Sequence, residues 1–149
     1  MAASTQARPD LQTNPTVSMD YPVATNTQIW QYEHCCVNAA GYLVPASDTA
    51  GLLYVGQARM SVNNTGANGA VSCPVESIHV NPYATFNAVT PLPAWVGQHL
   101  FFTDDNTVAL TGSTSHTVCA GRCETILITG ATGSVRVDRT DRFAPTTAA

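Results

Sequence analysis

The chain has 149 residues, of which 11% are charged, and its formal net charge is −4. That charged share is about half of the usual quarter, and a chain of this length normally forms one domain with its own core. The six basic residues are all arginine and form no basic run, so we expect no nucleic-acid partner, because phosphate binding needs a basic footprint. The uncharged surface, rich in Thr, Ser, Asn and Gln, favours packing against other protein subunits.

The sequence gives no sign of a membrane or an export route. No stretch approaches the roughly 20 apolar residues that span a bilayer, and residues 1–14 lack the hydrophobic region of a secretory signal. The chain contains five cysteines, an odd number, which without an export signal predicts reduced thiols in a cytosol-like compartment. We therefore expect no membrane partner and no disulfide bonds.

Both ends of the chain differ in composition from the middle. Residues 1–21 are polar, are interrupted by Pro9 and Pro15, and show no helical or strand period, which predicts an extended N-terminal arm. Residues 139–149 are similar and predict a C-terminal tail. The folded domain is therefore expected over residues 22–138.

The first half of this domain has the composition of short strands and turns. Residues 29–37 are rich in aromatic and β-branched side chains and predict a strand, followed by a turn at residues 38–41. Residues 42–44 form a short apolar segment that Pro45 ends, and residues 52–58 form a second apolar run. A loop rich in Gly and Asn follows at residues 63–69.

The second half continues the β pattern. Residues 70–80 alternate apolar and polar side chains around Pro74, which favours an edge strand or a bulge. The proline-rich residues 81–93 predict a loop, and the only helical turns are expected near residues 46–50 and 93–96. Two hairpins are expected, the first joining residues 98–103 to 107–110 and the second joining residues 118–129 to 134–138.

Short strands with a turn signal about every ten residues are typical of all-β proteins. We therefore expect an all-β fold: a single antiparallel β-sandwich or β-barrel domain, jelly-roll-like, with an extended N-terminal arm and a C-terminal tail. The predicted core follows the period of two along the strands. It consists of Ile29, Val37, Leu53, Val55, Val71, Cys73, Val75, Leu100, Phe102, Val118, Ile126, Ile128, Val135 and Val137.

The cysteine spacing indicates a structural role. Cys119 and Cys123 on one strand lie about 13 Å apart, since a strand rises ~3.3 Å per residue, and that distance excludes a disulfide or a shared metal. Cys35 and Cys36 are strand neighbours that point to opposite faces. We expect all five thiols to be unpaired and to bind no metal.

No catalytic or cofactor site is visible in the sequence. The histidines, His34, His79, His99 and His116, show no metal spacing and lie in no Cys/His cluster. The Asp-Asp-Asn segment at residues 104–106 lacks the alternating ligands and distal Glu of a calcium loop, and fits a tight hairpin turn better. We expect no enzymatic activity, no metal, no cofactor and no small-molecule substrate.

Seven motifs occur in an order that matches one known family. They are PVATNTQIW at residues 22–30, CVNAAGYLVPA at 36–46, YVGQA at 54–58, VNNTGANGA at 62–70, WVGQHLFF at 95–102, DDNTVA at 104–109 and AGR at 120–122. The chain resembles the cement, or decoration, proteins on the outside of tailed-bacteriophage heads over residues 22–138. It departs from their pattern at residues 76–82, where relatives carry a short apolar strand, and in continuing beyond Arg142.

The resemblance implies a structural function. Such a protein is made in the cytoplasm of the bacterial host, lies on the outer surface of the virion capsid, bridges neighbouring major capsid protein subunits and stabilises the expanded shell. The implied partners are the major capsid protein and further copies of the chain, as a dimer or a trimer. The arm and tail are expected to order on the capsid and to bind it. The residues expected to make this contact are Leu11, Val17, Met19, Tyr21, Arg139, Arg142 and Phe143.

The sequence leaves two alternative functions open. One is a receptor- or glycan-binding β module on the virion surface, with Trp30, Tyr83, Phe86 and Trp95 as candidate glycan-contacting rings. The other is a small β-scaffold enzyme, which would need a convergent polar cluster that the sequence does not reveal.

Overall fold

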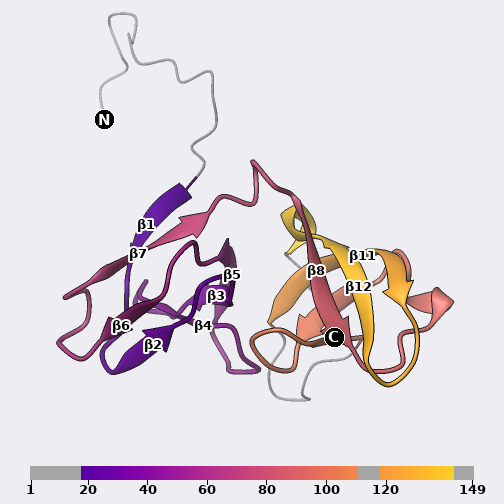
Figure 1. Ribbon diagram of the computed structural model, residues 1–149, viewed down its shortest axis with the longest axis horizontal. Helices are drawn as coiled ribbons and strands as arrows, with labels where there is room; N and C mark the ends of the chain where they lie inside the picture. The colour runs from indigo at the N-terminus through magenta and orange to yellow at the C-terminus, as the bar shows by residue number, and fades with distance from the viewer. Residues whose placement is uncertain (1–17, 111–117, 143–149) are drawn as a thin grey trace, which may run out of the picture.

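The computed structural model describes residues 18–110 and 118–142, and within these ranges the protein is all-β, as predicted. Two single-turn 3-10 helices, η1 (Pro93–Trp95) and η2 (Arg139–Asp141), accompany the strands. No helix in this part of the chain is long and apolar enough to span a membrane. The strands fall into two groups that lie side by side, which we call the N-terminal and C-terminal clusters (Figure 1).

The N-terminal cluster contains seven short strands in three small antiparallel sheets. The first sheet pairs β1 (Ser18–Pro22) with β7 (Ser72–Glu76), and the second pairs β2 (Thr27–Ile29) with β6 (Val62–Asn64). The third has the order β4 (Leu43–Pro45), β3 (His34–Val37), β5 (Leu53–Gln57), so that β3 lies in the middle. An isolated bridge between Ala58 and Val75 joins the segment after β5 to β7.

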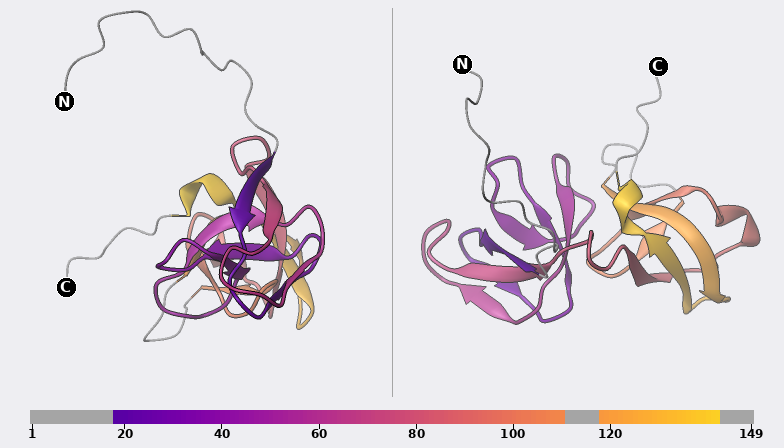
Figure 2. Two further views of the ribbon diagram at one scale, coloured as in Figure 1. Left: turned by 90° about the vertical axis from the view of Figure 1, so that its left-hand side faces the viewer. Right: turned by 90° about the horizontal axis from the view of Figure 1, so that it is seen from above.

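The C-terminal cluster is one curled five-stranded antiparallel sheet, shown from two further sides in Figure 2. Its strands are β8 (Tyr83–Ala88), β9 (His99–Phe102), β10 (Val108–Ala109), β11 (Cys119–Ile128) and β12 (Gly133–Asp138). The order β10-β9-β11-β12-β8 brings the two edge strands toward each other. The Asn87 N–H donates to the Asn106 carbonyl at 2.9 Å, so the sheet closes into a half-barrel.

Strand β3 contributes to the cores of both clusters because its two faces are both buried. Cys35 packs with Ile29, Leu43 and Val75 in the N-terminal core. Its neighbour Cys36 points the other way, into the core formed mainly by β8 to β12. The prediction that the two adjacent cysteines point to opposite faces of a strand is therefore confirmed.

A buried polar network accompanies the aromatic core between the two clusters. The His34 ring stacks on Phe86 with centroids 4.1 Å apart, and its Nδ1 lies 2.8 Å from the Tyr54 hydroxyl. Arg139 Nη1 donates to the same hydroxyl oxygen at 3.2 Å. Burial, together with the positive charge of Arg139, lowers the pKa of His34 to about 3, so the ring is neutral. The tautomer of this neutral ring decides whether Nδ1 or the Tyr54 hydroxyl donates the hydrogen bond between them.

Arg139 is fully buried although it is charged. Besides Tyr54, its guanidinium donates to the Asn81 carbonyl and, at 3.3 Å, to Gln57 Oε1. Glu76 Oε1 lies 3.7 Å away and supplies the opposite charge. These partners belong to β5, to β7 and to the connection between the clusters, so one side chain from η2 binds the two clusters together.

The structure confirms several local predictions. Both predicted hairpins are present, as β9–β10 and β11–β12, and the helical turn expected near residues 93–96 is η1. Val135 and Val137 are buried while Arg136 between them is exposed. The predicted core residues that are buried are Ile29, Cys73, Val75, Leu100, Phe102, Val118, Val135 and Val137, and those that are half-buried are Val37, Val55, Val71 and Ile126.

Other predictions need correction. Residues 81–93 are not all loop, because Tyr83–Ala88 form β8, which pairs with β12 along its full length. Two of the three buried side chains of β8 are alanines, so the alternation is weak in the sequence. Leu53 and Ile128 belong to strands but are 38% and 58% exposed, and Ile128 follows a register shift near the end of the long strand β11. The last residues of the predicted arm form β1.

We predict that Arg139→Leu destabilises the protein by about 3 kcal/mol, because it leaves the Asn81 carbonyl and other buried acceptors without their donor. The measurement is urea unfolding at neutral pH. Arg136→Leu is the matched control, since Arg136 is exposed and only lies over the Tyr83 ring at 4.4 Å, an interaction worth about 1 kcal/mol at most. Equal effects of the two substitutions would contradict the proposed role of Arg139.

Candidate functional site

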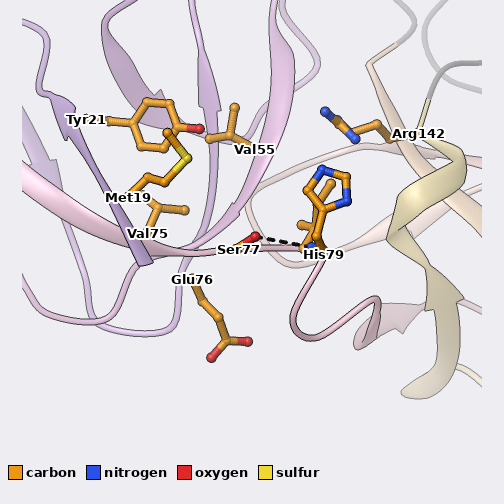
Figure 3. Close-up of a pocket in the computed structure, with 9 residues that line it drawn as sticks. Met19, Tyr21, Val55, Val75, Glu76, Ser77, His79 and Arg142 are labelled. Atoms are coloured by element: carbon orange, nitrogen blue, oxygen red, sulfur yellow. Dashed lines mark hydrogen bonds between the residues drawn. The ribbon is translucent and has the colours of Figure 1, made fainter. Parts of the chain in front are cut away.

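Three of the predicted partner-binding residues line one groove. Met19 and Tyr21 of β1 form one side of it, and Arg142, which follows η2, lies on the other (Figure 3). Their side chains converge because β1 pairs with β7 while η2 packs near the connection that follows β7. The structure thus brings together residues that are more than 100 positions apart in the sequence.

The groove is small and mostly apolar. It has a volume of about 100 Å³, and Val55, Val75 and Ile78 contribute its apolar lining. Arg142 supplies a guanidinium, whose pKa is lowered by burial, whereas the Glu76 side chain points away from the groove (Figure 3). A cofactor or substrate site usually needs about 300–1,000 Å³. This groove is therefore suited to one or two side chains of a partner protein.

The remaining predicted contact residues do not join the groove. Arg139 lies under the surface with its side chain fully buried, so it cannot contact a partner, which corrects its assignment to a binding tail. Leu11, Val17 and Phe143 lie outside the described residues. His79, which the sequence analysis considered only as a catalytic or metal residue, is exposed and lines the groove opposite β1.

The cysteines are placed for packing. All five are buried. Burial raises the pKa of Cys36 to about 12 and raises that of Cys35 further. Burial also raises the pKa values of Cys73 and Cys123. Because the thiolate is the nucleophile and the metal ligand, these positions disfavour both kinds of chemistry.

The hairpin loop between β9 and β10 has the geometry of a turn. Asp104 Oδ1 accepts hydrogen bonds from the backbone N–H groups of Asn106 at 2.9 Å and Thr107 at 2.8 Å. This carboxylate caps its own loop, as the sequence analysis favoured over a calcium site. Across residues 18–110 and 118–142, no three His, Cys, Asp or Glu side chains are grouped closely enough to hold a metal ion.

A carboxyl pair that the sequence did not reveal links the two clusters. Glu33 precedes β3, is 7% exposed, and accepts the Trp30 N–H on Oε2 at 2.8 Å. Burial and a hydrogen bond with the nearby Asp105 carboxyl raise the pKa of Glu33 to about 7. The two residues are 72 positions apart, so their contact depends on the packing of the hairpin against β3 and could not be read from spacing.

The four aromatic residues considered for a glycan site do not form one surface. Phe86 is buried against His34, and Trp95 is half-buried against the C-terminal core. Tyr83 opens β8, where its ring lies under Arg136. Only Trp30 among the four is mostly exposed, at 62%, and it belongs to the N-terminal cluster.

No model of a known protein family, no curated protein and no solved structure matches the chain.

We predict that Glu33→Gln makes the protein progressively more stable than the wild type as the pH rises from about 5 to 8. The folded chain binds more protons than the unfolded chain between the ordinary pKa of 4.5 and about 7, so stability is lost as Glu33 ionises. The expected gain is up to ~1.4 kcal/mol per pH unit in this window. Urea unfolding at several pH values measures it.

Glu124→Gln is the control, because Glu124 is exposed on β11. The difference in unfolding free energy between the Glu124→Gln variant and the wild type should stay constant over this pH range. A difference between Glu33→Gln and the wild type that stays constant from pH 5 to 8 would show that Glu33 does not titrate as described.

Proposed function

We propose that this chain is a non-enzymatic structural protein that binds other protein surfaces. More specifically, we propose a cement protein on the outer surface of a tailed-phage head, which bridges neighbouring major capsid protein subunits and stabilises the expanded shell. The observation that carries the proposal is the exposure of large apolar side chains on a surface that has little charge. Among the described residues, thirteen large apolar side chains are exposed, including several that are more than half exposed.

One group of these side chains lies at the end of the C-terminal cluster, which we call the apolar end. Val89 is 64% exposed, Leu92 is 54% exposed and Ile128 is 58% exposed. They come from the β8–η1 connection and from β11, and the Thr90 N–H donates to the Gly130 carbonyl at 2.8 Å, which ties the connection to the β11–β12 turn. A hollow of about 310 Å³ opens beside Val89.

Such a surface is typical of an interface. Apolar side chains that stay in contact with water favour association, and a neighbour that covers them gains about 25 cal/mol per Å² of buried apolar area. Interfaces of ~1,600 Å² are enough for stable association, and repetition over a capsid lattice multiplies the effect. Contacts with further copies of the chain, in a dimer or trimer, belong to the same proposal.

The groove at β1 supports a second contact. Residues 1–17 lead directly into β1, where Met19 is 54% exposed and Tyr21 is half-buried. A partner that binds the arm would therefore also meet the apolar groove and the Arg142 guanidinium. An arm combined with a preformed groove allows a small domain to contact a large surface.

The chemistry of the interior supports the non-enzymatic part of the proposal. The His34 ring, with its pKa lowered to about 3, is stacked and hydrogen-bonded in the core, and the thiols of Cys35 and Cys36 are buried with raised pKa values. A general base or a nucleophile needs both access to a substrate and a pKa near the working pH. These residues have neither property.

The first test counts the chain in particles purified from the source of this sequence by quantitative mass spectrometry. We expect copies in the hundreds per particle, and particles depleted of the chain should release DNA at a lower temperature. A few copies per particle would favour a tail or receptor component instead. Absence from particles, or unchanged heat resistance of depleted particles, would refute the cement function.

The second test uses surface variants of the purified chain added back to depleted particles. Leu92→Asp combined with Ile128→Asp should weaken binding at least tenfold, because it places charges where apolar area is buried. Leu53→Asp is the control, since Leu53 is partly exposed on the other cluster. Equal binding by both variants would contradict a role for the apolar end. Deletion of residues 1–17, which leaves β1 intact, tests the arm in the same assay.

A further inference from the structure

The turn between β2 and β3 presents two aromatic rings to the solvent. Trp30 is 62% exposed and Tyr32 is 68% exposed, the highest value among the exposed large apolar residues that the structure describes. Residues 30–33, which we call the aromatic turn, close with a hydrogen bond from the Glu33 N–H to the Trp30 carbonyl at 3.1 Å. The core therefore does not account for the position of either ring.

The backbone of this turn is strained at Tyr32. Its φ is 68°, in the left-handed region, where a β-turn normally carries Gly or Asn at the third position. A bulky aromatic residue in this conformation is uncommon, and strained residues of this kind cluster at functional sites. Because the Tyr32 ring is mostly exposed, packing does not explain why this position holds tyrosine.

Hydrogen bonds on both sides hold the aromatic turn rigid. The Tyr32 N–H donates to the Ala58 carbonyl at 2.8 Å, and the Tyr32 carbonyl accepts from Gln57 Nε2 at 3.0 Å. Gln31 is fixed in the same way, because its N–H donates to Ser61 Oγ at 3.0 Å and its Nε2 to the Arg59 carbonyl at 3.1 Å. The rings therefore stand on a preorganised base, which lowers the entropy cost of binding.

A polar hollow has Tyr32 in its lining. Its volume is about 150 Å³, and its polar side chains come from Gln31, Gln57, Arg59 and Glu76. Arg59 and Glu76 are only 3.9 Å apart, with side-chain exposures of 45% and 28%, so both charged groups remain within reach of a ligand. The hollow thus lies beside an aromatic residue and has amide, guanidinium and carboxylate groups in its lining.

We propose that the aromatic turn and this hollow form a binding site for one hexose unit of a glycan, with Tyr32 as the stacking platform. A sugar ring has an apolar C–H face that packs on an aromatic ring and a rim of hydroxyls that hydrogen-bond planar polar side chains. Arg59 can donate to those hydroxyls and Glu76 can accept from them. This function goes beyond capsid cementing, and would add a glycan contact to a chain exposed on a particle.

The size and the charge of the hollow favour a sugar over other ligands. A nucleotide or an organic cofactor would need a larger cavity, of about 300 Å³ or more. A phosphate or an acidic peptide would meet the Glu76 carboxylate beside Arg59, which opposes anion binding. A neutral ligand with many hydroxyls meets neither obstacle.

The experiment is ligand-observed saturation-transfer NMR on the full chain with D-glucose, D-galactose, D-mannose and N-acetyl-D-glucosamine, each in turn. We expect saturation transfer to the C–H protons of at least one sugar. Tyr32→Gly should reduce its affinity at least about tenfold. The same variant should unfold at an equal or higher temperature than the wild type, because glycine relieves the strain at φ 68°.

Thr90→Gly is the matched control. Thr90 also has a positive φ, of 46°, and is exposed, but it belongs to the C-terminal cluster. The Thr90→Gly variant should also unfold at an equal or higher temperature than the wild type, and it should bind the sugar as the wild type does. The proposal is overturned if none of the four sugars gives a signal, or if Tyr32→Gly binds as the wild type does. It is also overturned if Tyr32→Gly impairs only binding to capsid particles, since the turn would then be a protein contact.

Discussion

The fold depends on one buried guanidinium. Arg139 has no contact with solvent, and its charge is tolerated because Tyr54, Gln57, Glu76 and the Asn81 carbonyl surround it. These groups come from the N-terminal cluster and the connection, whereas Arg139 follows the last strand of the C-terminal cluster. A buried charge is costly unless it is paired and hydrogen-bonded, and Nη1 and Nη2 of Arg139 find their acceptors only when the two clusters are docked, while its Nε has no hydrogen-bond partner among the described residues. The network therefore specifies the arrangement of the clusters more than it adds stability.

The sequence alone was sufficient to predict the elements that depend on local patterns of residues. The β9–β10 hairpin followed from its Asp-Asp-Asn turn, and the burial of Val135 and Val137 followed from their alternation with Arg136. The pattern failed at β8, where alanines replace the large apolar residues that mark a strand. It also failed for Arg139, because an arginine near a chain end suggests a solvated tail, and only the tertiary packing supplies the acceptors that bury it. The groove of Met19, Tyr21 and Arg142 likewise depends on contacts that are remote in sequence.

The reactive side chains and the exposed apolar side chains lie in different parts of the molecule. The thiols of Cys35 and Cys36 and the ring of His34 are buried, and burial moves their pKa values away from the reactive range. Groups that could bind a surface, namely the apolar end, the groove at β1 and the aromatic turn, remain exposed on different parts of the molecule. Under the function proposed above, these exposed groups would let the chain meet more than one neighbour in an assembly.

The central structural claim is that the two clusters form one cooperative unit through β3 and Arg139. Native-state hydrogen exchange tests it most directly, by comparing the most protected amides of β3 with those of β12 at several denaturant concentrations. We expect the two strands to open with the same free energy, to within ~1 kcal/mol, because Cys36 and Tyr54 of the N-terminal cluster complete the core of the C-terminal cluster and Arg139 bonds to Tyr54 and to the connection between the clusters. An opening free energy of β3 well below that of β12, with a separate denaturant dependence, would show two independent units and would contradict the account.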